Sequence, residues 1–322
     1  MRLSEAAYAE AAFLDERLLE TGPDMLWADW PTLEAAATAV GRETDFIFHI
    51  GHVGSTLIAR LLGRHERVFA LREPALLRSA GALRAEAGFS DALLVLFKLY
   101  ARVWRPGQRS LVKTTSFVAD LGCEALDCLP SAKAILMVAA PQVFIATLLA
   151  GEASRAELPR VTPARLGRLR RRLGEPLFSA AASEGEMAAA GWACEICALA
   201  DIAIRFPDRA LWLDFDRFLA DAPYGLLKVA RHLDLGFGPD DVAIMLSGPE
   251  LGQYSKAPDQ AFDAARRHEV IGEAMHRHGR EIQRGLAWLD AAATAHPAIA
   301  RASQVAAAAG RAFSLDRQTE RG

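Results

Sequence analysis

DFIFHIGHVGSTLIARLL, residues 45–62, joins a β-rich apolar run to a glycine-containing turn and an apolar helix start. The apolar run ends at Gly51, and a second glycine, Gly54, comes directly before Ser55 and Thr56. This order predicts a strand, a glycine loop and a helix N-terminus. Such a loop points backbone N–H groups at one spot, where the helix dipole adds partial positive charge. We therefore expect an anion, such as a phosphate, to bind there.

The loop lacks the lysine found in ordinary nucleoside-triphosphate loops. It has no Gly-Lys-Ser/Thr, so the GxxxxGK[ST] pattern fails, and with it the side chain that reaches the outer phosphates. A second interpretation of the stretch is a simple strand–turn–helix connection in which Ser55 or Thr56 caps the helix. At this point both interpretations stay open.

Five short apolar segments alternate with helical patterns along the chain. They are residues 45–50, 67–71, 109–113, 133–138 and 210–214. Apolar strands separated by helices predict an α/β fold of three layers, a central parallel sheet with helices on both faces. Ligands in such sheets bind at the carboxyl ends of the strands. His52, Glu73 and Lys113 all follow strand ends, so we expect them to meet at one edge.

The segment GSTLIARLL (54–62) resembles the phosphosulfate-binding loop of sulfotransferases, in which Ser-Gly-Thr-Thr opens a helix. Other segments resemble further parts of this family in the same order. They are RVFALREPALLR (67–78), SLVKTTSFVADL (110–121), AKAILMVAAPQVFIATLL (132–149) and ALWLDFDRFLADAPYGLLKVARHLDL (210–235). The resemblance implies a P-loop NTPase-like sheet of about five strands. It also implies the donor 3′-phosphoadenosine-5′-phosphosulfate (PAPS).

The resemblance assigns roles to individual residues. The loop residues that would hold the 5′-phosphate are Gly51, His52, Val53, Gly54, Ser55 and Thr56. Glu73 falls on the acceptor base of tyrosylprotein sulfotransferase-like enzymes, and Lys113 on the lysine after the third strand. Lys113 and His52 would stabilise charge on the leaving group, so no metal is expected. Lys256 resembles a residue of the family's C-terminal nucleotide loop.

Two positions depart from the family pattern. The family's 3′-phosphate site has an Arg followed eight residues later by a Ser, and the matching positions here are Ala139 and Thr147. A hydrogen bond to a charged group contributes about 1.5–3 kcal/mol, so its loss would weaken PAPS binding by about ten- to a hundred-fold. His52 also stands where the family commonly has Lys or Arg. The donor is therefore PAPS held by other basic residues, a different nucleotide, or nothing that reacts.

Each candidate residue also has a purely structural interpretation. Glu73, which precedes a proline, suits a helix start. Lys113 suits an exposed strand end, and His52 suits a loop in water. We expect His49, in the middle of a strand, to support the core rather than take part in chemistry. The arginine-rich residues 152–172 form either a solvated helix face or a segment that reaches the 3′-phosphate.

Composition limits the class of protein. The 322 residues are 52% hydrophobic with a net charge of −3, which allows a sizeable core and argues against broad nucleic-acid binding. No apolar run reaches the ~18 residues of a membrane span, and the N-terminus is unlike a signal peptide. Cys194 and Cys197 form a CxxC inside a helical run, where we expect core packing. We expect a cytoplasmic protein with reduced thiols.

These observations predict one sulfotransferase-like domain, with N-terminal helices at 1–44, a core at 45–257 and C-terminal helices at 258–322. The expected activity is sulfuryl transfer from PAPS to a hydroxyl or amine of a small-molecule acceptor, without nucleic acid or membrane as partner. One alternative is a nucleotide-dependent phosphotransferase on the same fold. Another is a non-catalytic nucleotide-binding protein, which the alanine at position 139 would suit.

Overall fold

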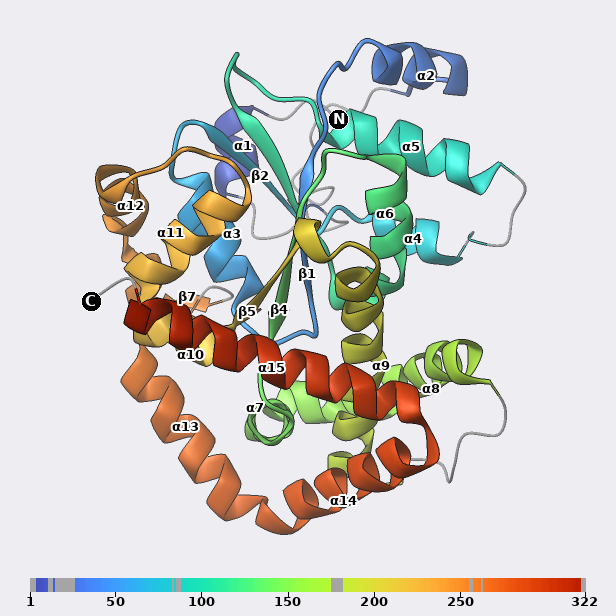
Figure 1. Ribbon diagram of the computed structural model, residues 1–322, viewed down its shortest axis with the longest axis vertical. Helices are drawn as coiled ribbons and strands as arrows, with labels where there is room; N and C mark the ends of the chain where they lie inside the picture. The colour runs from blue at the N-terminus through green and yellow to red at the C-terminus, as the bar shows by residue number, and fades with distance from the viewer. Residues whose placement is uncertain are drawn as a thin grey trace.

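A five-stranded parallel sheet, in the order β2-β3-β1-β4-β5, forms the centre of the fold (Figure 1). The computed structural model describes residues 4–10, 14, 27–82, 84, 88–174, 182–254, 257–261 and 263–319. The strands are β1 (Asp45–His49), β2 (Val68–Arg72), β3 (Arg109–Lys113), β4 (Ala134–Val138) and β5 (Ala210–Asp214). Every neighbouring pair is parallel. The predicted α/β class and five-stranded parallel sheet are confirmed, with strand bounds within one residue of those expected.

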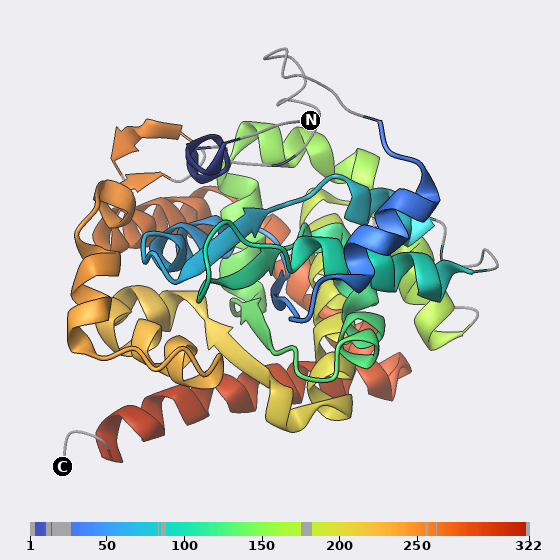
Figure 2. The same cartoon turned by 90° about the horizontal axis from the view of Figure 1, so that it is seen from above.

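Helices cover both faces of the sheet (Figures 1 and 2). One face carries α3 (Ser55–Gly63), α11 (Ala222–His232) and α12 (Pro239–Leu246). The other carries α5 (Phe89–Tyr100), α6 (Gly122–Cys128) and α9 (Glu184–Arg205), with α4 (Leu76–Ala82) and the 3₁₀ segment η2 (Ser116–Leu121) beside them. α2 (Trp30–Thr38) packs on the outside of α5.

The chain changes direction at β1, and this creates the place for a site. From β1 it crosses through α3 to β2, and β2 and β3 lie on one side of β1. The later crossovers run in the opposite direction and lead to β4 and β5 on the other side. Right-handed crossovers in opposite directions put their helices on opposite faces. A crevice therefore forms outside the carboxyl end of β1, the position where open α/β sheets bind ligands.

Additional helices gather around this carboxyl-terminal edge (Figure 1). They are α7 (Pro141–Ala150), α8 (Glu152–Leu173), α10 (Phe215–Ala220), α13 (Ala264–Arg277) and α14 (Gly279–Ala295). α15 (Pro297–Thr319) packs along α9 and β5. The remaining elements are α1 (Glu5–Glu10), η3 (Pro207–Arg209), η4 (Pro249–Gly252) and the antiparallel pair β6 (Gln253–Tyr254) and β7 (Ala257–Ala261).

The long helix α9 is the central helix of the core. By length and composition it could cross a membrane, but 83% of its most apolar window is buried inside the fold. Glu195 and Asp201 interrupt it, so the sequence contains no unbroken apolar run of that length. Cys194 and Cys197 are both buried on this helix, and burial raises the pKa of the Cys197 thiol to about 12. The predicted core packing of the CxxC is thus confirmed.

Candidate active site at the carboxyl-terminal edge of the sheet

A cavity of about 560 Å³ opens at the carboxyl-terminal edge of the sheet. Its walls come from the β1–α3 loop, the segments after β2 and β3, α7 and α8, and the starts of α10 and α13. The predicted site residues that line it are Gly51, His52, Val53, Gly54, Ser55, Thr56, Glu73, Lys113 and Thr147. Lys256 lies outside the described residues. In the described ranges of the chain, no group of three or more His, Cys, Asp or Glu side chains is placed to hold a metal ion.

Two glycines give the loop its shape. Gly51 has a φ of 91° and Gly54 a φ of 63°, in the left-handed region that glycine adopts without steric penalty. A methyl group added at Gly54 would overlap the ring of Phe215, the first residue of α10. His52 also has a positive φ, of 53°, which is uncommon for a residue with a Cβ. The loop is therefore held in an unusual backbone conformation beneath Phe215.

α3 presents its N-terminus to the cavity. Gly54 is its N-cap, and a glycine has no side chain with which to cap. Ser55 and Thr56 are the first two helical residues, so the interpretation in which one of them caps the helix is wrong. Both are buried and line the cavity. Because the first backbone N–H groups of a helix lack intrahelical acceptors, this end offers donors and partial positive charge to an anion.

One predicted phosphate donor is used within the protein. The Gly51 N–H donates to His49 Nδ1 at 3.0 Å, and His49 Nε2 lies 2.8 Å from the carbonyl oxygen of Thr114. A carbonyl can only accept, so Nε2 carries the proton and Nδ1 accepts. His49 thus ties the loop to the end of β3, which is the supporting role expected for it. The Gly51 N–H is thus engaged by His49 in this structure, and the contribution of the Gly51–Thr56 backbone to anion binding stays a prediction.

Glu73 and Lys113 form an ion pair across the ends of β2 and β3. Only 1% of the Lys113 side chain and 12% of the Glu73 side chain are exposed, so an exposed strand-end lysine is ruled out. The Glu73 N–H donates to the Lys113 carbonyl at 2.7 Å, which extends the ladder past β2 to a residue with a φ of 49°. Arg78 lies 3.6 Å from the second carboxylate oxygen. Strand pairing therefore fixes both side chains at the cavity.

Positions 139 and 147 supply little to a second phosphate. The Thr147 hydroxyl lines the cavity but donates to the Val143 carbonyl at 2.7 Å. Ala139 is buried, and its carbonyl accepts from the Trp192 indole at 3.1 Å. The arginines that line the cavity are Arg78, Arg165, Arg266 and Arg267.

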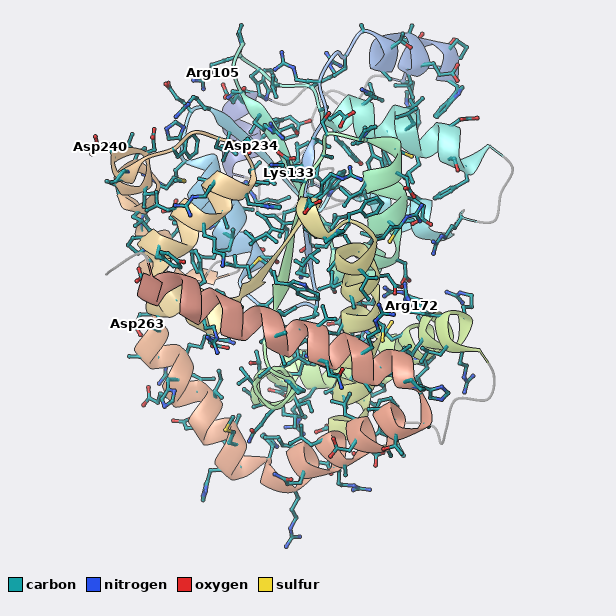
Figure 3. The ribbon with its side chains drawn as sticks, in the orientation of Figure 1. Arg105, Lys133, Arg172, Asp234, Asp240 and Asp263 are labelled. Carbon is teal, nitrogen blue, oxygen red and sulfur yellow. The ribbon has the colours of Figure 1, made fainter. Side chains whose placement is uncertain are left out.

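The α13 arginines had no sequence signal that linked them to the site. Asp263, labelled in Figure 3, caps the start of α13 by accepting from the Arg266 N–H. Arg267 donates to Asp216 at 2.7 Å, and its guanidinium lies 4.8 Å from the ring centre of Phe215. Arg267 therefore supports the ring that covers the loop. Only the folding of distant segments onto one edge brings these residues together.

The arginine-rich helix α8 turns one side toward the core. Arg168 donates to both carboxylate oxygens of Glu195, at 2.7 and 2.9 Å, and also pairs with Asp120. Arg172, labelled in Figure 3, pairs with Asp120 and Asp201. Burial raises the pKa of Asp120, but the two guanidinium groups outweigh it and hold the pKa below its usual value. The expectation of a purely solvated face is wrong for this side of α8.

The comparisons with known proteins gave structural matches alone. No protein-family profile and no curated protein matches the chain. A sulfotransferase domain from the curacin biosynthetic pathway is similar in structure, with 14% sequence identity over 77% of this chain and 97% of that domain, and a TM-score of 0.42. A sulfotransferase domain from the Synechococcus PCC 7002 olefin synthase has 16% identity over 72% of this chain and 86% of that domain, and a TM-score of 0.40. At these identities and TM-scores, neither similarity supports a conclusion about activity. The residues of the cavity are therefore the basis for inferring one.

Proposed function

We propose that this protein transfers a sulfuryl group from PAPS to a hydroxyl or amine of a small-molecule acceptor. The observation that supports this most is the meeting of a glycine-capped helix N-terminus with the Lys113–Glu73 pair at one cavity. The helix end suits an anion, the lysine suits a leaving group that gains charge, and the carboxylate suits an acceptor that loses a proton. These three features together suit sulfuryl transfer.

The residues around the loop fit the phosphosulfate end of the donor. The backbone N–H groups at the start of α3 and the hydroxyls of Ser55 and Thr56 would hold the 5′-phosphate. The second phosphate fits less well, because position 139 brings no charge. A cation from α13, such as Arg266, would have to supply it. Arg266 lies at the cavity wall and pairs there with Glu269 at 2.5 Å.

Lys113, His52 and Glu73 would each have a different role in the reaction. PAPS, when bound, supplies an activated sulfuryl group, and the protein supplies position and electrostatics. Lys113, buried and fixed by its ion pair, would neutralise charge that develops on the leaving oxygen. His52 would add a donor from the loop. Glu73 would accept the proton of the acceptor hydroxyl or amine at a carboxylate oxygen.

We also propose that the protein works in the cytoplasm. All four cysteines are free thiols, which suits a reducing compartment. The net charge of −3 favours a small-molecule acceptor over a nucleic acid.

A thermal-shift titration with a panel of nucleotides tests the donor. The ligands are 3′,5′-diphosphoadenosine (PAP), AMP, adenosine, adenosine 5′-phosphosulfate, and ATP or GTP with magnesium. A ligand at 100 times its dissociation constant adds about 2.7 kcal/mol to the free energy of unfolding. We expect PAP to stabilise the protein more than AMP, and adenosine to have no effect. The difference between PAP and AMP measures how well the chain holds the second phosphate without an arginine at position 139.

Other outcomes would replace the proposal. A shift with a triphosphate alone would favour phosphotransfer. No shift with any nucleotide would remove PAPS as the donor. If PAP binds, transfer of ³⁵S from labelled PAPS to a panel of hydroxyl and amine compounds then identifies acceptors.

A further inference from the structure

We infer that Arg165 binds an anionic group on the acceptor, so that the acceptors are hydroxyl or amine compounds that carry a carboxylate, phosphate or sulfate. The inference rests on the proposed function, because it names the substrate class of the same cavity.

Arg165 is a buried arginine that faces the cavity. Its side chain is 8% exposed and forms part of the cavity wall. The Nε atom is buried and finds no hydrogen-bond partner among the residues that the structure describes. α9 makes room for it with a glycine, because a methyl group at Gly191 would lie 2.9 Å from Arg165 Nη1. A buried N–H without an acceptor is unfavourable, so the protein alone leaves this guanidinium incompletely hydrogen-bonded.

The nearest carboxylate is already used by another arginine. Glu195 is 0% exposed and lies 3.6 Å from Arg165 Nε, which is too far for a hydrogen bond. Both of its oxygens accept from Arg168. The charges alternate between α8 and its neighbours α9 and η2, from Arg165 through Glu195, Arg168 and Asp120 to Arg172. Arg165 is the member of this series at the cavity, and its guanidinium is the one least satisfied by the protein.

The position of Arg165 favours the acceptor over the donor. Its guanidinium lies 5.0 Å from the ring centre of Phe117, in η2. η2 follows β3, the strand that ends in Lys113, and packs against α9 and β1. Arg165 therefore lies on the side of the cavity built by β3, which also holds the ion pair with Glu73. Thr147 and the α13 arginines come from other walls. An anion on Arg165 and a hydroxyl near Glu73 would belong to one acceptor molecule.

Two substitutions at this position test the inference. Arg165→Met removes the donors and keeps most of the stem, and Arg165→Lys keeps the charge. Glu195 remains paired with Arg168 in both, so both variants are expected to fold, as checked by circular dichroism and thermal unfolding. The probe is benzoate, with the uncharged benzamide as control, measured by calorimetry with and without saturating PAP. We expect wild type to bind benzoate and not benzamide, Arg165→Met to lose at least ten-fold in affinity, and Arg165→Lys to retain part of it.

Measuring PAP affinity as well as benzoate affinity distinguishes an anion on the acceptor from the 3′-phosphate of the donor. If Arg165 serves the acceptor, PAP affinity changes less than two-fold in Arg165→Met. If PAP affinity falls to that of AMP, the anion is the 3′-phosphate of the donor, and the acceptor assignment is wrong. Equal benzoate affinity in wild type and Arg165→Met, or no benzoate binding to wild type, would overturn the inference. If benzoate binding depends on Arg165 but the protein does not bind PAP, the inference about Arg165 stands and the proposed donor is wrong.

Discussion

The two edges of the parallel sheet differ in how completely the protein pairs the charged groups that lie there. At the amino-terminal edge, Asp45 is 1% exposed and accepts from Arg109 Nε at 2.6 Å, from Arg109 Nη2 at 3.1 Å and from the Lys133 N–H at 2.8 Å. Lys133 in turn pairs with Asp234 at 2.6 Å, and Figure 3 labels both side chains. At the carboxyl-terminal edge, the N-terminus of α3 has a glycine as its cap, and Arg165 Nε has no hydrogen-bond partner in the described part of the chain.

The difference separates charges that hold the fold from charges that are available to a ligand. A buried charge that is paired and hydrogen-bonded within the protein has little hydrogen-bonding capacity left for a ligand. A helix end or a guanidinium that lacks acceptors at a cavity gains from an anion that enters. The Lys113–Glu73 pair lies between these cases, because it is paired within the protein but borders the cavity.

The largest expected effect is on turnover, from Glu73→Gln. The amide keeps the size of the side chain and can still accept from Lys113, but it is a far weaker proton acceptor than a carboxylate. Because general-base catalysis contributes about 10²–10⁴-fold, we expect kcat to fall by that factor. The assay is ³⁵S transfer from labelled PAPS to any acceptor that wild type uses.

Glu43→Gln is the matched control from the opposite edge. Glu43 accepts from the Ser131 N–H at 2.6 Å, far from the cavity, and its loss should leave kcat within a factor of two. PAP affinity should be unchanged in both variants. If Glu73→Gln keeps kcat within about three-fold of wild type, Glu73 is not the base. A protein that binds PAP but transfers to no acceptor would favour the non-catalytic alternative.

A pair of glycine substitutions should differ in stability. Gly54 at the cavity and Gly107 before β3 both have a positive φ, of 63° and 85°. An alanine at either position is strained by about 1–2 kcal/mol. Gly107 has nothing within 4 Å of an added methyl group, whereas Gly54 lies against Phe215. Overpacking adds about 1–3 kcal/mol, so Gly54→Ala should lose about 3 kcal/mol and Gly107→Ala about 1 kcal/mol.

Denaturant unfolding of both variants measures this difference, and PAP titration adds a second criterion. Gly54→Ala should also weaken PAP, because moving Phe215 or the loop shifts the start of α3. Gly107→Ala should bind PAP as wild type does. Equal losses of unfolding free energy in the two variants would mean that Phe215 moves aside freely and does not fix the loop.

The sequence was sufficient for the parts of the molecule that depend on local pattern. β1 to β5 are short apolar runs bounded by turns, and their number, type and bounds could be predicted. Parallel strands have their carboxyl ends at one edge, so the meeting of His52, Glu73 and Lys113 at one cavity could also be predicted. The resemblance to a family added expected roles for these residues, and it singled out Ala139 as a departure from the family pattern.

Pairings between distant segments could not be predicted. The inward arginines of α8, at positions 165, 168 and 172, follow helical spacing, and this stripe was a signal that could have been used. Their partners, Asp120 and Glu195, lie on other elements, so the sequence did not show which arginine would be left at the cavity. The use of the Gly51 N–H by His49 likewise depends on how the β1 loop meets the end of β3.

The smallest expected effect is a pH dependence from His232, at the amino-terminal edge. Its Nε2 lies 3.2 Å from the Ala134 carbonyl, and burial, with Lys133 nearby, lowers its pKa below 6.5, while Asp234 acts in the opposite direction. Below pH 6.5 the unfolded chain takes up a proton that the folded protein resists. The free energy of unfolding therefore falls as the pH drops from 6.5 through the folded pKa, and this term is absent above pH 6.5.

His232→Gln removes this titration and keeps an N–H that can donate to the same carbonyl. Denaturant unfolding at pH 7.5, 6.5, 5.5 and 5.0 should show wild type losing stability relative to the variant only in the acidic half of the series. The prediction follows because burial and the neighbouring lysine both disfavour a second positive charge at this edge. If wild type and His232→Gln lose the same unfolding free energy at each pH, the folded protein protonates His232 as readily as the unfolded chain does. Burial at the amino-terminal edge would then not disfavour the imidazolium.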